Sequence, residues 1–146
     1  MASRLAPFSG GAALALSLAL LGSPLVARAA TIVYTNDVLG ELEPCGCRNN
    51  PTGGMTRKAS LLERTRADDS ELLQLDAGDL LFETGTLPPA LTSQAEVQAS
   101  YLLQAHERVG HDAVVPGEKD FALGVKKFEK LIGKHSKIKF LAANLV

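Results

Sequence analysis

The feature that most constrains this chain is an alternation of short strand-like runs with helix-like segments. The runs are rich in β-branched and aliphatic residues and cover residues 31–36, 71–75, 112–115 and 137–142; the first three stop at Asp or Pro. Helical spacing of apolar residues lies between them, over residues 55–66, 93–109 and 123–132. Strands that are joined through helices by right-handed crossovers pair in parallel. The sequence therefore predicts an α/β fold with a mostly parallel sheet of β-α units.

The spacing of apolar residues also predicts the buried face of each helix. The predicted inward residues are Met55, Ala59 and Leu62 in the first helix, Val97, Tyr101 and Ala105 in the second, and Phe128, Leu131 and Ile132 in the third. Ser93, with Glu96 three positions later, matches a capping box, so the second helix is expected to begin there. Residues 41–52, rich in Pro, Gly, Asn and Cys, are expected to form a loop.

The N-terminal segment has the pattern of an export signal. Arg4 precedes the apolar stretch Ala12 to Leu21, and Ala27-Arg28-Ala29 is a small-x-small cleavage site. The apolar stretch is too short to span a bilayer comfortably, so no stable membrane span is expected after cleavage. The sequence thus predicts a signal peptide over residues 1–29 and a periplasmic or secreted protein.

Composition limits the remainder to one small globular domain, residues 30–146. The chain is 46% hydrophobic and 21% charged, proportions that exclude a disordered or collagen-like polypeptide. Removal of the signal takes two arginines away and leaves 13 Lys and Arg against 16 Asp and Glu, a net charge of −3. We therefore expect no nucleic-acid partner.

Acidic residues follow three of the predicted strands. Asp37 ends the first, Asp79 follows the second, and Glu118 and Asp120 follow the third. Ligands of open parallel sheets bind beyond the carboxyl ends of the strands, where these side chains are expected to converge. Carboxylates suit Mg, Mn or Ca, and added imidazoles would favour Zn or Fe. The alternative is that each acid merely caps a turn or a helix through its backbone.

Cys45-Gly46-Cys47 lies in the loop after the first strand. Export permits a disulfide between the two cysteines, although so small a ring would be strained. Ligation of a soft metal ion and unpaired thiols are the other two interpretations. The three histidines, His106, His111 and His135, are expected to be ordinary surface or core-edge residues.

Five segments, in order, resemble the opening part of a known family. They are Tyr34–Pro44, Gly53–Ala59, Leu75–Leu81, Asp112–Phe121 and Leu141–Leu145. Together they are similar to the 5′-nucleotidase and UDP-sugar hydrolase branch of the calcineurin-like metallophosphoesterases. The resemblance covers essentially all of residues 30–146, and implies the first half of an αββα sandwich.

The resemblance also implies an activity and a cofactor. Members of this family hydrolyse phosphate esters or nucleotides with two divalent metals, here Mn, Zn or Mg, which polarise the phosphoryl group and activate water. Asp37 matches the first metal ligand of the family, and Asp79 matches the aspartate that bridges the two metals. The implied substrate is a nucleotide or another phosphate ester.

Four positions depart from the family pattern. Leu39 replaces a histidine ligand, Glu118 an asparagine ligand, Lys119 the catalytic histidine, and Asp120 a glutamate. Glu118 remains a candidate metal ligand, and Lys119 is the candidate catalytic residue by position. These departures predict a degenerate metal site.

Two hypotheses follow from these patterns. The first is an exported metallophosphoesterase, of which this chain is an incomplete, N-terminal part; half of the sandwich would be missing, which leaves an apolar sheet face for a partner to cover. The second is a non-catalytic periplasmic binding, redox or assembly module that acts through the Cys45-Gly46-Cys47 loop.

Overall fold

The main element of the computed structural model, which describes residues 30–47 and 49–143, is a four-stranded parallel sheet of order β1-β4-β5-β6. Its strands are β1 (Ile32–Thr35), β4 (Leu73–Asp76), β5 (Ala113–Val114) and β6 (Lys139–Phe140). The register places Thr35 opposite Asp76, and Asp76 opposite Val114. The predicted α/β class and parallel pairing are confirmed; the predicted signal peptide lies outside the described residues.

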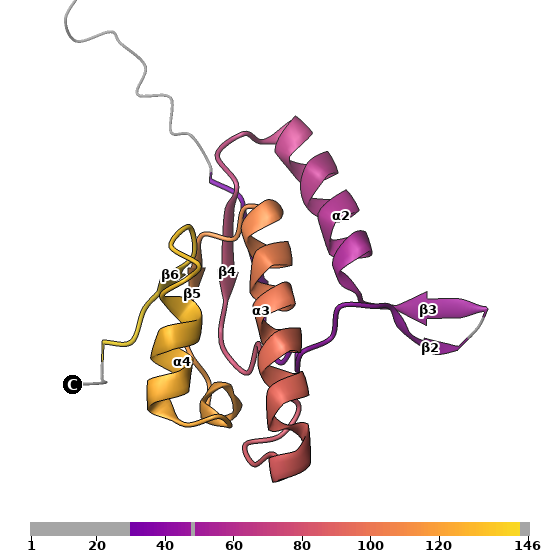
Figure 1. Ribbon diagram of the computed structural model, residues 1–146. Coiled ribbons are helices and arrows are strands. Elements are labelled where there is room, and N and C mark those ends of the chain that lie inside the picture. The colour runs from indigo at the N-terminus through magenta and orange to yellow at the C-terminus, as the bar shows by residue number, and fades with distance from the viewer. Residues whose placement is uncertain (1–29, 48, 144–146) are drawn as a thin grey trace, which may run out of the picture.

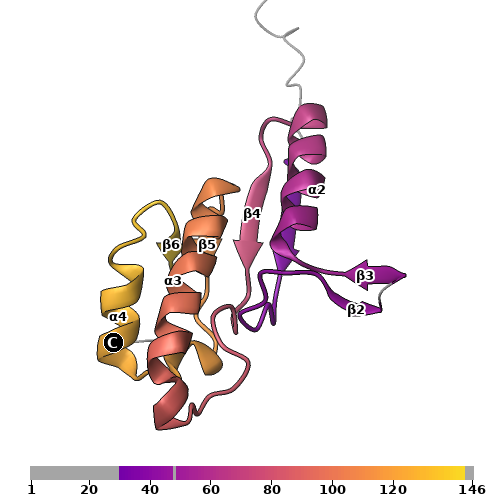
Figure 2. The same ribbon diagram turned by 45° about the vertical axis from the view of Figure 1, so that its right-hand side comes forward.

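The helices lie on the same side of this sheet (Figures 1 and 2). They are α2 (Met55–Asp68), α3 (Thr92–Arg108) and α4 (Val125–Ile132), with the short 3₁₀ helices η1 (Pro89–Leu91) and η2 (Lys119–Phe121). Gln74, Asp76 and Val114 are buried because they point toward the helices. Among the described residues, no helix has the length and apolar character needed to cross a membrane.

A single apolar core forms between the sheet and the helices. It contains Leu80, Leu81, Phe82, Ala99, Leu102, Leu103, Val114, Phe128, Leu131 and Ile138. The prediction for the last helix is confirmed at Phe128 and Leu131, which are buried, and Ile132 packs against the core in part.

The predicted inward face of α3 is wrong. Val97 and Tyr101 are 56% and 60% exposed, whereas Ala99, Leu102 and Leu103 are buried. Apolar residues lie on more than one side of this helix, so spacing alone offers two candidate stripes. The contact with the sheet and α4 selects the stripe with spacings of three, four and seven residues.

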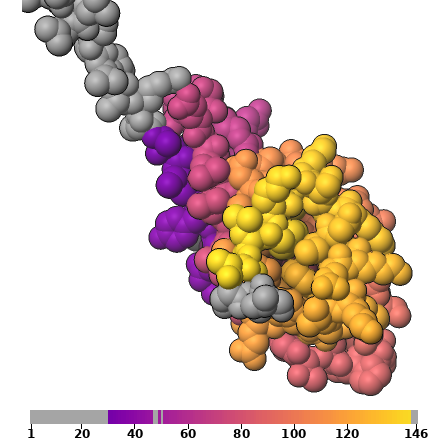
Figure 3. All heavy atoms as spheres, turned by 90° about the vertical axis from the view of Figure 1, so that its left-hand side faces the viewer, coloured from indigo at the N-terminus to yellow at the C-terminus, as the bar shows by residue number. Residues whose placement is uncertain are grey.

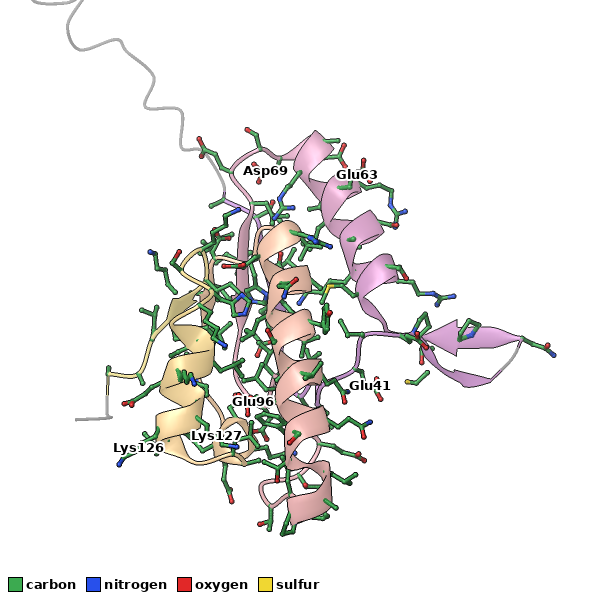
Figure 4. The ribbon with its side chains drawn as sticks, in the orientation of Figure 1. Glu41, Glu63, Asp69, Glu96, Lys126 and Lys127 are labelled. Carbon is green, nitrogen blue, oxygen red and sulfur yellow. The ribbon has the colours of Figure 1, made fainter. Side chains whose placement is uncertain are left out.

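The predicted capping box is also wrong. The helix begins at Thr92, its N-cap is Leu91, and no side chain in the described part of the chain caps it. The 3₁₀ helix η1 runs directly into α3, so the backbone is already helical where α3 begins. Glu96 instead forms a 3.5 Å ion pair with Lys127 of α4 (Figure 4).

The expected loop over residues 41–52 contains a β-hairpin. Its strands, β2 (Cys45–Cys47) and β3 (Asn50–Thr52), pair antiparallel and project from the body of the molecule (Figure 1). An exposed hairpin needs no alternation of apolar and polar residues, which is why sequence periodicity did not indicate it.

The face of the sheet opposite the helices is open. Ile32, Tyr34 and Leu141 are 56%, 73% and 56% exposed. Figure 3 shows atoms of β1 and β4, in indigo and magenta, at the surface beside the C-terminal segment. The apolar sheet face that the sequence predicts is therefore exposed in this chain.

Candidate functional site

The loops that follow β1 and β4 bind each other through their backbones. The N–H of Asp37 donates to the carbonyl of Gly78 at 3.0 Å, and the N–H of Leu39 donates to the carbonyl of Asp79 at 2.9 Å. Asp37, Leu39 and Asp79 all have left-handed backbones, with φ of 50°, 56° and 54°. Residues with side chains rarely adopt this conformation, and it is concentrated at functional sites. This shared loop structure brings the two aspartates together.

Lys119 lies between the two aspartates. Its ammonium is 3.2 Å from Oδ2 of Asp79 and 3.7 Å from Oδ1 of Asp37. Its backbone N–H donates to Oδ1 of Asp79 at 2.9 Å, and the amide of Asn36 donates to Oδ2 of Asp37 at 2.6 Å. The hydrogen bond with Asp79, aided by the charges of both aspartates, raises the pKa of Lys119. The side chain therefore stays cationic at neutral pH.

Gly117 permits this close packing. A Cβ atom at this position would overlap the carboxylate and the backbone nitrogen of Asp79. The Pro116-Gly117 pair, which marks the end of the third strand in the sequence, thus also provides the space for an aspartate from a neighbouring loop.

Asp120 is a positioning residue in this structure. It is 1% exposed; its Oδ1 accepts from the N–H of Leu81 at 2.7 Å, and its Oδ2 accepts from the N–H of Gly117 at 2.8 Å. Burial raises its pKa against the opposing effect of these hydrogen bonds. The carboxylate joins the loop after β4 to the segment that carries Lys119. It therefore fixes the position of the Lys119 backbone.

Glu118 and Leu39 lie at the edge of the aspartate pair. Glu118 is exposed at the N-terminus of η2, and Leu39 lines a hollow of about 210 Å³ of mixed polar and apolar character. Within residues 30–47 and 49–143, no three His, Cys, Asp or Glu side chains are grouped so that they could hold a metal ion. With Lys119 between the aspartates, the residues present do not fit a two-metal centre. The metal roles assigned to Asp37, Asp79 and Glu118 stay predictions.

A cavity opens beside Asp37, between β1 and the first turns of α2. It has a volume of about 540 Å³, and Tyr34, Met55, Arg57 and Lys58 are among its lining residues. This size lies within the usual range of small-molecule sites, about 300 to 1,000 Å³. Arg57 and Lys58 are not among the residues predicted from the sequence; the signal that could have located them is the Gly53-Gly54 pair just before α2.

Lys58 is held by a partly buried chain of polar groups at the wall of the cavity. Its ammonium donates to Oγ1 of Thr35 at 3.1 Å, and that hydroxyl donates to Oδ2 of Asp76 at 2.6 Å. Burial lowers the pKa of Lys58 to about 8, although Asp76 opposes the change. Burial likewise raises the pKa of Asp76.

The three histidines are more deeply buried than expected. His106, His111 and His135 are 0%, 2% and 5% exposed, so they belong to the interior rather than to the surface. Nδ1 of His106 lies 2.6 Å from Nδ1 of His111, which also lies 3.2 Å from Nε2 of Gln74. Burial lowers the pKa of His106 to about 2 and that of His111 to about 4. Both imidazoles are therefore neutral at pH 7.

The cysteine segment lies away from this arrangement, in the β2–β3 hairpin. Cys45 is exposed and pairs with Thr52 across the hairpin, and the backbone of Cys47 pairs with that of Asn50. The disulfide, the soft-metal site and the unpaired thiols all stay predictions.

Known proteins share this arrangement of strands and loops. The chain is 28% identical to a 5′-nucleotidase precursor from Thermus thermophilus, with a TM-score of 0.64 over 79% of this chain and 22% of that one. The calcineurin-like phosphoesterase YfkN from Bacillus subtilis, at 18% identity and a TM-score of 0.53, shares the fold over 69% of this chain and 33% of its own. The fold is therefore that of the calcineurin-like phosphoesterases.

Sequence similarity narrows this class. The chain is 30% identical over 121 residues to a snake venom 5′-nucleotidase from Gloydius brevicauda, which covers 79% of this chain. The resemblance to the 5′-nucleotidase branch is thus confirmed. The chain spans about a fifth of the length of these nucleotidases, 19% and 22%. No protein-family model matches the chain.

Proposed function

We propose that this chain is part of an exported phosphoesterase of the 5′-nucleotidase type, whose site binds phosphate esters or nucleotides and has a degenerate metal centre. The observation that carries the proposal is the meeting of Asp37 and Asp79 at the carboxyl ends of neighbouring parallel strands, beside a cavity of about 540 Å³. Ligands of parallel sheets bind at this edge.

The charges around the site suit a phosphoryl group. Lys119 supplies a fixed ammonium between the aspartates, and Arg57 and Lys58 supply two further cations at the wall of the cavity. Phosphoryl transfer depends mainly on positioning and on stabilisation of charge, which such cations provide. Because its pKa is raised, Lys119 acts as a hydrogen-bond donor to a leaving oxygen rather than as an efficient proton donor.

The direct test is hydrolysis of p-nitrophenyl phosphate and AMP by the purified chain, with and without added Mn²⁺. We expect measurable phosphate release that Asp37→Asn and Asp79→Asn each reduce by about tenfold or more. Glu63→Gln, on the exposed side of α2 (Figure 4), is the matched control and should keep the wild-type rate. Activity that both aspartate variants retain would contradict the proposed site.

The proposal also includes export and a covering partner. Cleavage after Ala29 is tested by N-terminal sequencing of the mature protein from the periplasm or medium of the expressing cell.

The exposed sheet face around Tyr34 is proposed to bind a polypeptide, because apolar patches of this kind mark interaction surfaces. Ile32→Lys, at an exposed residue of this face that does not line the cavity, should then weaken that association and leave the helices intact by circular dichroism.

A further inference from the structure

The oxygens of the aspartate pair already have nitrogen neighbours from this chain. Lys119 contacts both oxygens of Asp79, Oδ1 through its backbone N–H at 2.9 Å and Oδ2 through its ammonium at 3.2 Å. The amide of Asn36 donates to Oδ2 of Asp37 at 2.6 Å, and the ammonium of Lys119 lies 3.7 Å from Oδ1. A cation that approached the pair would have to displace at least one of these groups.

Hydrogen bonds of the backbone hold Lys119 beside the two aspartates. Asp120, the next residue, accepts hydrogen bonds from Leu81 and Gly117, and the backbone of Lys119 is hydrogen-bonded to Asp79 itself. The side chains of Lys119 and Asp79 are 32% and 20% exposed, so the ammonium lies at the pair rather than extending into solvent. An ion pair with a fixed backbone loses less entropy than one between two free surface chains.

We propose that the ammonium of Lys119 takes the place of a divalent cation between Asp37 and Asp79, and that its removal opens a divalent-cation site there. The inference rests on the proposed function for the class of site and concerns the same two aspartates. A divalent ion beside the ammonium would meet like-charge repulsion at a separation of a few ångströms, which this partly shielded environment screens less than water does. Without the ammonium, the two carboxylates repel each other and gain from a cation.

The test is titration of Mn²⁺ by calorimetry into the wild-type chain, Lys119→Met and Lys119→Arg. Methionine keeps most of the length of the side chain without its charge, and arginine keeps the charge. We expect Lys119→Met to bind one Mn²⁺ at least about tenfold more tightly than the wild type does. Lys119→Arg should resemble the wild type. Lys127→Met, which removes the α4 lysine that pairs with Glu96 of α3, is the matched control and should also bind like the wild type.

A second readout locates the bound ion and reports at the same time whether each variant is folded. Mn²⁺ broadens nearby amide signals in NMR spectra, so in the wild type the signals of residues 37 and 79 should stay sharp at Mn²⁺ concentrations that broaden them in Lys119→Met. Equal Mn²⁺ affinity in the two proteins, or broadening at these residues at the same Mn²⁺ concentrations in both, would overturn the inference. Neither readout depends on turnover, so loss of hydrolysis in the earlier assay would count against the proposed function alone.

Discussion

Two polar clusters adjoin β4, and they are kept in opposite electrostatic states. The cluster of Asp37, Asp79 and Lys119 lies at the carboxyl end of the strand, and its side chains are 53%, 20% and 32% exposed. The cluster of His106 and His111 contacts Gln74 beneath α3, and both imidazoles are at most 2% exposed. The first is held together by ion pairs and the second is neutral.

Burial explains the difference. A partly solvated site can keep charges when each has a partner, whereas a site without water favours the neutral form of every group. The histidines can share a hydrogen bond between their Nδ1 atoms only if one of these atoms carries a proton and the other does not. Among residues 30–47 and 49–143, no hydrogen-bond partner is found for Nε2 of either ring or for Oε1 of Gln74. The buried cluster therefore depends on its protonation state, and the exposed cluster depends on its counter-charge.

The largest expected effect is destabilisation of the folded chain by acid. Below pH 6.5 the unfolded chain protonates both imidazoles, while the folded chain resists protonation of His111 until about pH 4 and of His106 until about pH 2. The neutral imidazoles therefore stabilise the folded chain above pH 6.5. As the pH falls to 4, the free energy of unfolding decreases by on the order of 3 kcal/mol per imidazole. Urea unfolding across this range measures it.

The control for acid unfolding is the double variant His106→Leu with His111→Leu. Asp76 and Asp120 have raised pKa values, so their protonation at low pH stabilises the folded chain, opposite to the effect of the histidines. This stabilising effect should remain in the variant. We expect the variant to lose much of the pH dependence between 6.5 and 4. An unchanged slope would mean that the histidine cluster is not the neutral, buried pair described above.

An intermediate effect is expected at the link beneath the exposed cluster. Asp120→Ala leaves the N–H groups of Leu81 and Gly117 without their acceptor, which should lower the free energy of unfolding by about 3 kcal/mol. Asp120→Asn keeps one acceptor oxygen and should cost clearly less. Chemical denaturation of both variants provides the comparison; equal losses would show that the two hydrogen bonds do not act separately.

The smallest effect on stability is expected from Lys119→Met. Exposed ion pairs add little to folding, so its melting temperature should match the wild type within experimental error. The measurement is a thermal melt followed by circular dichroism, at low and at high salt. A large loss of stability would mean that the strand-end cluster, like the histidine cluster, supports the fold.

Much of the fold was predictable because strand and helix periodicities are local. The strand that ends before Asp37, and the helix that buries Phe128 and Leu131, follow from their own residues. The hairpin at Cys45 was not predictable because its pairing is exposed and produces no apolar period. The buried face of α3 required knowledge of what packs against it.

The candidate site was predictable in part for a similar reason. Asp37 and Asp79 could be paired because the carboxyl ends of parallel strands meet at one edge. Their hydrogen bonds to Lys119, and the use of Asp120 as a link between loops, depend on side-chain directions that residue types do not fix. The same limitation applies to Lys58, whose low pKa arises from burial against β1 and β4.

The sequence by itself therefore determined the α/β order of the elements and the position of aspartates at the ends of two strands. Only the tertiary structure decided that Lys119 lies between those aspartates and that the histidines are buried and neutral. The reason is physical: periodicity and turn chemistry act between neighbours in the chain, whereas the charge state of a side chain depends on solvent exposure and on partners that are distant in sequence.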